Sequence, residues 1–208
     1  MGILSKIFNN TRKPEGFFGR MMVSGMNGGT HAAMANWGLD RVEIPASGEL
    51  LDIGCGGGAN LSRLMQRSAD GKVTGVDYSA VSVAKSQKTN AKAIADGHCK
   101  VLEASVANLP FADGAFAMVT AFETIYFWPE IEKSFAEVRR VLQPSGRFLI
   151  VNEDDGLSGS NDRWERIIDG MHTYTPDEVQ SHLAAAGFRD IVVHRHEPRH
   201  WLAVTATK

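Results

Sequence analysis

The chain has 208 residues, of which 43% are hydrophobic and 22% are charged, and its formal net charge at pH 7 is −2. This length and composition indicate one globular domain with a substantial core. The small net charge argues against a nucleic-acid-binding surface, and no apolar run approaches the roughly 20 residues that a membrane span needs. The two cysteines, Cys55 and Cys99, imply no disulfide framework. We therefore expect a cytoplasmic protein without a signal peptide.

Residues 1–30 are rich in glycine and predict a loosely structured arm with short helices. Helical spacing of apolar residues, together with capping residues, then predicts five longer helices. These are 31–39, 60–67, 79–96, 131–142 and 175–186. Ser79 is the expected N-cap of the third helix. Pro144 and Gly146 are expected to mark the end of the fourth helix, and Pro176 and Gly187 to bound the fifth.

Short apolar runs between these helices predict the strands. In chain order they are 49–53, 72–76, 100–104, 117–121, 147–152, 190–196 and 201–207. The first five alternate with helices, which favours a doubly wound, Rossmann-like α/β fold with a mostly parallel seven-stranded sheet. The last two are separated only by the polar turn 197–199, so one of them must run antiparallel as a C-terminal hairpin strand.

No repeat or linker divides the chain, and we expect one compact unit with two parts. Residues 1–48 form an N-terminal helical arm or lid, and residues 49–208 form the ligand-binding domain. The arm before about Gly38 is expected to become ordered over a bound ligand and to exclude water from it. In that case residues 15–37 should gain protection from hydrogen exchange when the ligand binds.

The most informative segment is LLDIGCGGGANLSRL at residues 50–64. A short apolar run ends in a carboxylate, turns through glycines and opens into a helix, whose first N–H groups face a ligand. Gly54, Gly56 and Ala59 loosely satisfy the dinucleotide-binding fingerprint. However, Asp52 would repel a pyrophosphate at this place and attract a ligand with an ammonium and a sulfonium group. S-adenosylmethionine (SAM) is such a ligand.

Four separated motifs occur in the chain in a fixed order: LLDIGCGGG at 50–58, VTGVDYS at 73–79, NLPFADGAF at 108–116 and VRRVLQPSGR at 138–147. Together they resemble the class I SAM-dependent methyltransferases, particularly the ubiquinone/menaquinone-biosynthesis type known as methyltransferase domain 11. The segment 174–188 is similar to the final helix of that family. The ordered set, rather than any single motif, makes the resemblance specific.

The resemblance implies a SAM site at the ends of the strands. Asp77 would accept hydrogen bonds from both ribose hydroxyls, Tyr78 would pack on the adenine, and Ser105 and Val106 would contact the adenine edge. The full set of cofactor-binding residues implied is Asp52, Gly54, Cys55, Gly56, Asp77, Tyr78, Ser79, Ser105, Val106 and Ala121. Two alternatives stay open: Asp77 as a carboxylate that caps the following helix, and Asp52 as a structural carboxylate satisfied by loop amides.

The acceptor side is expected beyond the fourth strand, in AFETIYFWPE at residues 121–130. Glu123 stands in an apolar run, where a carboxylate is costly unless it is paired. We expect Glu123, Tyr126 and His31 to be the catalytic or acceptor-contacting residues, with Phe127 in the same pocket wall. The alternatives are that Glu123 is a surface carboxylate, that Tyr126 and Phe127 form only a hydrophobic wall, and that His31 is a solvated helix histidine. Many relatives of the quinone group have paired histidines where Tyr126 and Phe127 stand, so a quinone precursor is not favoured.

The function predicted is methyl transfer from SAM to a small-molecule acceptor, with S-adenosylhomocysteine as the product and no nucleic-acid partner. One alternative is a SAM-binding regulatory protein without catalysis, and a weaker one is an NAD-dependent oxidoreductase, which Asp52 disfavours. No metal site is expected, because His194 and His196 share a strand face without a third ligand. The sequence leaves the acceptor and the oligomeric state open.

Overall fold

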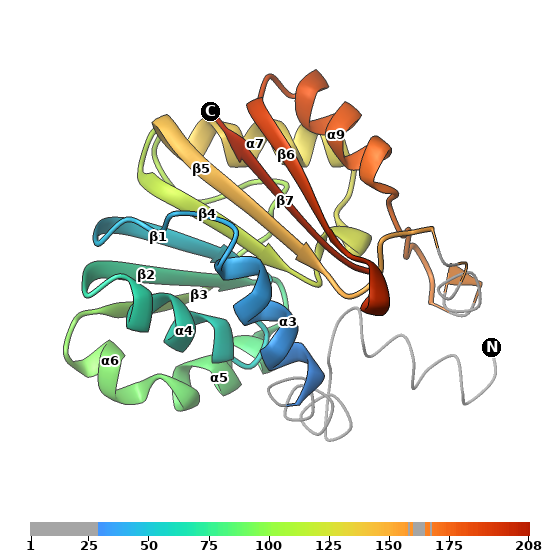
Figure 1. Cartoon of the computed structure of the whole chain (residues 1–208). Coiled ribbons are helices and arrows are strands. Elements are labelled where there is room, and N and C mark those ends of the chain that lie inside the picture. The colour runs from blue at the N-terminus through green and yellow to red at the C-terminus, as the bar shows by residue number, and fades with distance from the viewer. Residues whose placement is uncertain (1–28, 158, 160–164, 167) are drawn as a thin grey trace.

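The computed structural model describes residues 29–157, 159, 165–166 and 168–208, so most of the predicted arm lies outside the described residues. Within the described part, seven strands form one sheet in the order β3-β2-β1-β4-β5-β7-β6 (Figure 1). The strands are β1 (Ser47–Ile53), β2 (Asp70–Asp77), β3 (Cys99–Glu103), β4 (Phe116–Phe122), β5 (Leu142–Asn152), β6 (Arg189–His196) and β7 (Trp201–Thr207).

The direction of the strands confirms the predicted fold class. Neighbours from β3 to β5 are parallel, whereas β7 is antiparallel to both β5 and β6. The strand order reverses between β1 and β4, because the chain builds outward through β2 and β3 and then returns to the other side of β1. In open α/β sheets, ligands bind beyond the carboxyl ends of the strands at such a switch point.

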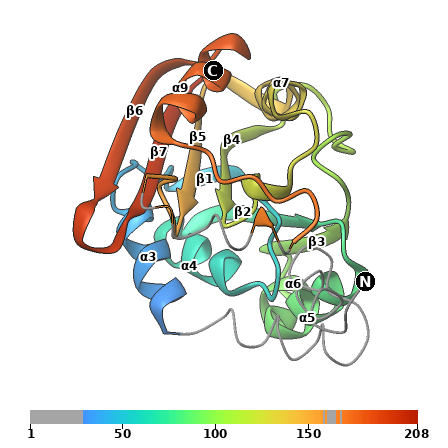
Figure 2. The same cartoon turned by 90° about the vertical axis from the view of Figure 1, so that its right-hand side faces the viewer.

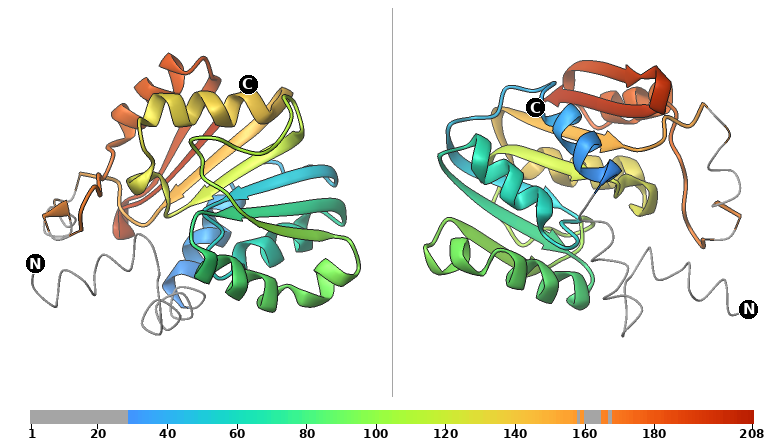
Figure 3. Two further views of the ribbon diagram at one scale, coloured as in Figure 1. Left: turned by 180° about the vertical axis from the view of Figure 1, so that it is seen from behind. Right: turned by 60° about the horizontal axis from the view of Figure 1, so that its bottom comes forward.

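Helices cover both faces of the sheet (Figures 1 and 3). One layer holds α3 (Thr30–Leu39), α4 (Ala59–Arg67), α5 (Ala80–Thr89) and α6 (Ala91–Ala95), and the other holds α7 (Ile131–Val141) and α9 (Pro176–Ala185). The perpendicular view in Figure 2 separates the two layers. Each layer buries its own apolar cluster, with Met34 and Leu61 in the first and Phe135 and Leu183 in the second. Burial of these side chains supplies the main driving force for the fold.

The helix predicted over 79–96 is divided at Asn90 into α5 and α6, which corrects the sequence analysis. The Asn90 side chain is buried and donates hydrogen bonds to the carbonyl oxygens of Gly58 and Ser86, at 3.0 and 3.1 Å. Its carbonyl accepts from the Ser62 hydroxyl at 2.8 Å. These bonds tie the end of α5 to the glycine-rich loop. The expected N-cap is confirmed, because the Ser79 hydroxyl oxygen accepts from the backbone N–H of Ser82.

The boundary between α7 and β5 also differs from the expectation. The helix ends at Val141 and the strand starts at the next residue, so Pro144 and Gly146 lie inside β5 rather than in a loop before it. The register with β4 shifts between Phe116 and Met118, and Ser145 has a φ of +62°. An irregular strand of this kind accommodates a proline, which cannot donate a ladder hydrogen bond.

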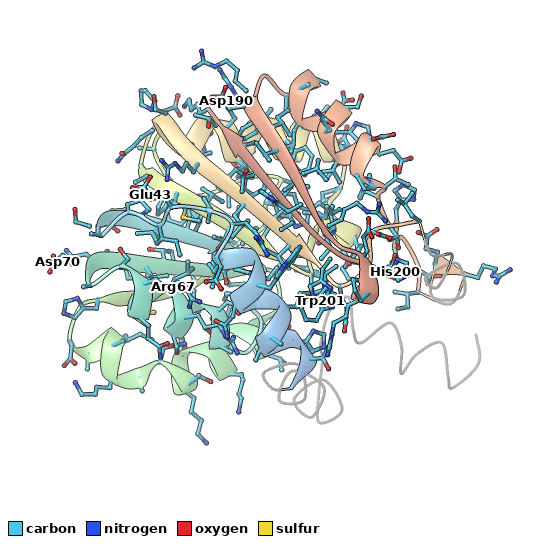
Figure 4. The ribbon with its side chains drawn as sticks, in the orientation of Figure 1. Glu43, Arg67, Asp70, Asp190, His200 and Trp201 are labelled. Atoms are coloured by element: carbon cyan, nitrogen blue, oxygen red, sulfur yellow. The ribbon has the colours of Figure 1, made fainter. Side chains whose placement is uncertain are left out.

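Helix α3 packs on strands β5 and β7. Trp37 of α3 lies beside Trp201 at the start of β7, with ring centroids 6.0 Å apart, and Figure 4 shows Trp201 next to this helix. A Cβ on Gly38 would come within 2.4 Å of a Val151 methyl carbon, so the helix backbone approaches β5 closely. His31 in the first turn of α3 lies near the carboxyl end of β5, because its Nδ1 is 3.8 Å from Glu153 Oε2. No helix of the described residues has the length and hydropathy of a membrane span.

Candidate SAM-binding and acceptor site

The loop after β1 requires glycine for two separate physical reasons. Gly54, Gly56 and Gly58 have φ values of +76°, +50° and +82°, which side chains with a Cβ rarely adopt. A Cβ on Gly54 would also lie 2.2 Å from the Thr124 methyl carbon, and a Cβ on Gly58 2.4 Å from the Asn90 amide nitrogen. A Cβ on Gly56 would meet no atom within 4 Å. The loop is therefore closely packed at its two ends and open in the middle.

Asp52 lies in β1 beneath this loop and is 1% exposed. Its Oδ1 accepts a hydrogen bond from the Thr120 hydroxyl of β4 at 2.7 Å. Burial, with a further contribution from the negative charge of Asp77, raises the pKa of Asp52 to about 7, although the bond from Thr120 opposes the shift. A cationic ligand group nearby would favour the ionised form. The partner of Asp52 is thus a side-chain hydroxyl rather than the loop amides that the structural alternative assumed.

Asp77 ends β2 and holds the glycine loop to the start of α5. Its Oδ2 accepts from the backbone N–H of Gly56 at 3.0 Å, and its Oδ1 from the backbone N–H of Ser79 at 2.9 Å. Burial raises the pKa of Asp77, and these two bonds oppose the shift. Because a carboxylate oxygen can accept more than one hydrogen bond, the helix-capping role leaves acceptor capacity for ribose hydroxyls. The two roles proposed from the sequence are compatible.

The remaining predicted cofactor residues fall into two groups by exposure. Tyr78 after β2 is 38% exposed, and Ser105 after β3 is also exposed. Ser79, Val106 and Ala121 are 1%, 6% and 0% exposed. Tyr78 and Ser105 thus offer side-chain surface at this edge of the sheet, whereas the other three are enclosed by the protein.

Cys55 carries a buried thiol, 5% exposed, whose sulfur lies 3.8 Å from the Ser86 hydroxyl oxygen. Burial and the nearby carboxylates Asp52 and Asp77 raise the pKa of this thiol well above its ordinary value. The thiolate is the nucleophilic form of cysteine. Cys55 is therefore unsuited to nucleophilic catalysis. Its contribution to the loop is its backbone.

A cluster of polar groups lies where β4 and β5 end. Glu123 follows β4 with a φ of +60°, and its backbone N–H donates to the Val151 carbonyl at 2.9 Å. Its Oε1 accepts from the Tyr126 hydroxyl at 3.3 Å and from the backbone N–H of Glu153. Withdrawal from water, together with the like charges of Glu153 and Asp154, raises the pKa of Glu123 to about 8. Glu123 is therefore a paired carboxylate and not a solvated surface residue.

His31 reaches the same cluster from α3. Its Nδ1 lies 3.8 Å from Oε2 of Glu153, and the two side chains are 34% and 42% exposed. The structure thus brings together all three predicted catalytic residues, His31, Glu123 and Tyr126. Sequence reasoning missed Glu153 and Thr120. The acidic run Glu153–Asp155 at the end of a predicted strand was the available signal for Glu153, because strand ends hold ligand sites in this fold.

This sheet order, with a glycine loop after β1 and an acid at the end of β2, defines a Rossmann-like fold with a ligand site at its switch point. Residues 51–150 match the family model described as methyltransferase domain. These residues form a domain of the class I SAM-dependent methyltransferase family.

Two curated relatives each match about two thirds of the chain. The chain is 33% identical over 150 residues to 27-O-demethylrifamycin SV methyltransferase of Amycolatopsis mediterranei, covering 69% of this chain and 55% of the relative. It is 31% identical over 160 residues to malonyl-[acyl-carrier protein] O-methyltransferase of Geobacter sulfurreducens, covering 69% and 57%. The chain thus spans a little more than half the length of these relatives.

A solved structure extends the likeness in fold. The crystal structure of a SAM-dependent methyltransferase from Aquifex aeolicus superimposes with a TM-score of 0.75 and 19% identity, covering 90% of this chain and 97% of the other. SAM is the cofactor of the family, and the residues present fit it: Gly56 faces open space, Asp77 keeps acceptor capacity, and Asp52 is a buried carboxylate suited to a cation.

Proposed function

We propose that this protein transfers the methyl group of SAM to a small-molecule acceptor that has an apolar body and one polar group. The observation that carries the proposal is the placement of two sites at one edge of the sheet. Asp52, Asp77 and the glycine loop stand at the ends of β1 and β2, and the cluster around Glu123 stands at the ends of β4 and β5. The strand order, in which β1 is next to β4, supports placing these two sites side by side.

On the cofactor side, each residue has a role that follows from its chemistry. Asp77 accepts from the ribose hydroxyls, and Tyr78 and Ser105 contact the adenine together with the backbone of Val106. Gly54, Cys55 and Gly56 let the loop backbone approach the ligand, and Asp52 attracts the ammonium group. Ser79 and Ala121 support this site from within the protein, because both are buried. When bound, SAM supplies a methyl group made electrophilic by the sulfonium.

On the acceptor side, Glu123 and the Tyr126 hydroxyl hold the polar group of the acceptor, and His31 borders it from α3. The rings of Tyr126 and Phe127, whose centroids are 6.2 Å apart, provide an apolar wall. Such a site aligns the acceptor atom with the methyl group. We propose that the N-terminal arm that precedes β1 is the lid that keeps water from the reacting groups, with its described helix α3 already packed on the sheet.

Calorimetry tests the cofactor. We expect S-adenosylhomocysteine to bind with micromolar or better affinity and NAD to show no measurable binding, because Asp52 repels a pyrophosphate. Isotope-labelled SAM, incubated with a panel of small hydroxylated and amino acceptors and analysed by mass spectrometry, then tests the transfer. Binding of NAD as tight as that of S-adenosylhomocysteine would contradict the proposal.

Substitution of Glu123 by Gln separates charge from shape on the acceptor side. We expect turnover of an accepted substrate to fall at least tenfold, while affinity for S-adenosylhomocysteine changes less than twofold, because Glu123 contacts the acceptor and not the cofactor. The matched control is Glu132→Gln, which removes an exposed carboxylate on α7. Unchanged turnover in Glu123→Gln would show that this carboxylate has no part in the reaction.

A further inference from the structure

We propose that His31, Glu123 and Glu153 bind one divalent transition-metal ion at the acceptor end of the site. The three residues come from three separate elements: the first turn of α3, the segment after β4 and the segment after β5. One nitrogen or oxygen ligand atom of each residue lies within 4.8 Å of those of the other two. The inference rests on the proposed function for what the ion does, but the ion can be detected without it.

The distances suit a metal ion after small side-chain movements. Two atoms bound to one ion at about 2.2 Å each are at most about 4.4 Å apart. The pair His31 Nδ1 and Glu153 Oε2, at 3.8 Å, already satisfies this limit. Rotation of the partly exposed Glu153 side chain can bring its carboxylate closer to that of Glu123 without moving the backbone.

The backbone holds the central ligand in place. Glu123 has a φ of +60°, a backbone conformation that residues with a side chain rarely adopt. Hydrogen bonds from its own N–H to Val151, and from the N–H of Glu153 to its carboxylate, maintain this geometry. Backbone strain that fixes a polar side chain is frequent at functional sites.

The charges of the cluster favour a cation. The carboxylates of Glu123 and Glu153 lie close together in this cluster, and Asp154 is the next residue in the chain. Within the described residues, the ion pairs of Glu123 and Glu153 include no lysine or arginine; His31 is the ion-pair partner of Glu153. A divalent ion would relieve the repulsion between the carboxylates.

The ligand set also indicates the kind of ion and acceptor. One imidazole with two carboxylates favours Mn²⁺, Fe²⁺, Co²⁺ or Zn²⁺ over Mg²⁺ and Ca²⁺, which prefer oxygen ligands alone. Three protein ligands would leave positions open for an acceptor hydroxyl, whose pKa a bound ion would lower. The hydroxyl proton passes to solvent, the oxygen forms the bond to the methyl carbon, and the carbon–sulfur bond breaks with its electron pair on sulfur. We therefore infer a hydroxylated acceptor.

Calorimetric titration of the EDTA-treated, dialysed full chain with MnCl₂ tests the site. We expect one Mn²⁺ per chain, with affinity at least tenfold above that for MgCl₂, and an absorption band from bound Co²⁺ in a parallel titration. His31→Ala and Glu153→Gln should each weaken Mn²⁺ binding at least tenfold. The matched control is His182→Ala, because His182 Nδ1 lies 3.0 Å from Glu132 in a surface pair that has no third ligand within the part of the chain that the structure describes.

Binding of S-adenosylhomocysteine in the presence of EDTA separates this inference from the proposed function. Retained cofactor binding without saturable Mn²⁺ binding would overturn the metal site alone, whereas lost cofactor binding would count against the cofactor assignment. Equal Mn²⁺ affinity in wild type and His31→Ala would also overturn the metal site. Circular dichroism of each variant confirms that it is folded, so that weakened binding reports on the ligands.

Discussion

Replacement of Asp77 by Ala is expected to weaken S-adenosylhomocysteine binding by about 2–3 kcal/mol, or about 30- to 150-fold, because hydrogen bonds to a charged group contribute about 1.5–3 kcal/mol. The variant loses the acceptor for the ribose hydroxyls and also the bonds that Asp77 accepts from Gly56 and Ser79. The loop is then less well ordered before the ligand binds. Calorimetry at a single pH measures the change in affinity.

Two companion variants make this result specific. Asp77→Asn keeps one acceptor oxygen and should lose less affinity than Asp77→Ala. Asp96→Ala removes an exposed aspartate at the end of α6, paired with Lys92, and should leave cofactor binding unchanged. Wild-type affinity in Asp77→Ala would restrict this carboxylate to its helix-capping role.

Asp52→Asn is expected to stabilise the protein without ligand while it weakens cofactor binding. The pKa of Asp52 in the folded protein is about 7, against an ordinary value of 3.8. The folded state therefore holds the proton more tightly than the unfolded state does. Protonation of Asp52 therefore stabilises the folded state. This contribution to the free energy of unfolding is fully present below pH 3.8 and is lost as the pH rises through about 7.

At pH 8 the variant should have a free energy of unfolding about 2–4 kcal/mol above that of the wild type, since each pKa unit corresponds to about 1.36 kcal/mol. Most of this difference should disappear at pH 4. Urea denaturation at the two pH values measures it. The carbonyl of an asparagine can still accept from the Thr120 hydroxyl, so packing is preserved.

Cofactor binding gives the second half of the test. In the wild type, affinity for S-adenosylhomocysteine should rise between pH 6 and pH 8, because ionised Asp52 attracts the ammonium group. In Asp52→Asn the affinity should be lower at pH 8 and nearly independent of pH. Parallel pH profiles in the two proteins would show that Asp52 does not face the ligand cation.

The sequence by itself determined the fold class, the number of strands and their succession along the chain, the family and the N-cap at Ser79. These features depend on local patterns: a period of two or 3.6 residues, a capping hydroxyl, or a glycine run after a strand. Even the antiparallel hairpin of β6 and β7 followed from the short polar turn between them. The glycine loop was likewise visible, because glycine is the residue that adopts positive φ values readily.

Only the tertiary structure decided the division of the helix at Asn90, the partner of Asp52 and the composition of the acceptor cluster. Asn90 ends α5 because its side chain bonds to a loop 32 residues away in the chain, and Asp52 meets Thr120 across 68 residues. His31, Glu123 and Glu153 likewise come from three elements. Contacts of this range leave no periodic signal, because parallel strands and the helices on them bring distant residues together only when the sheet is assembled.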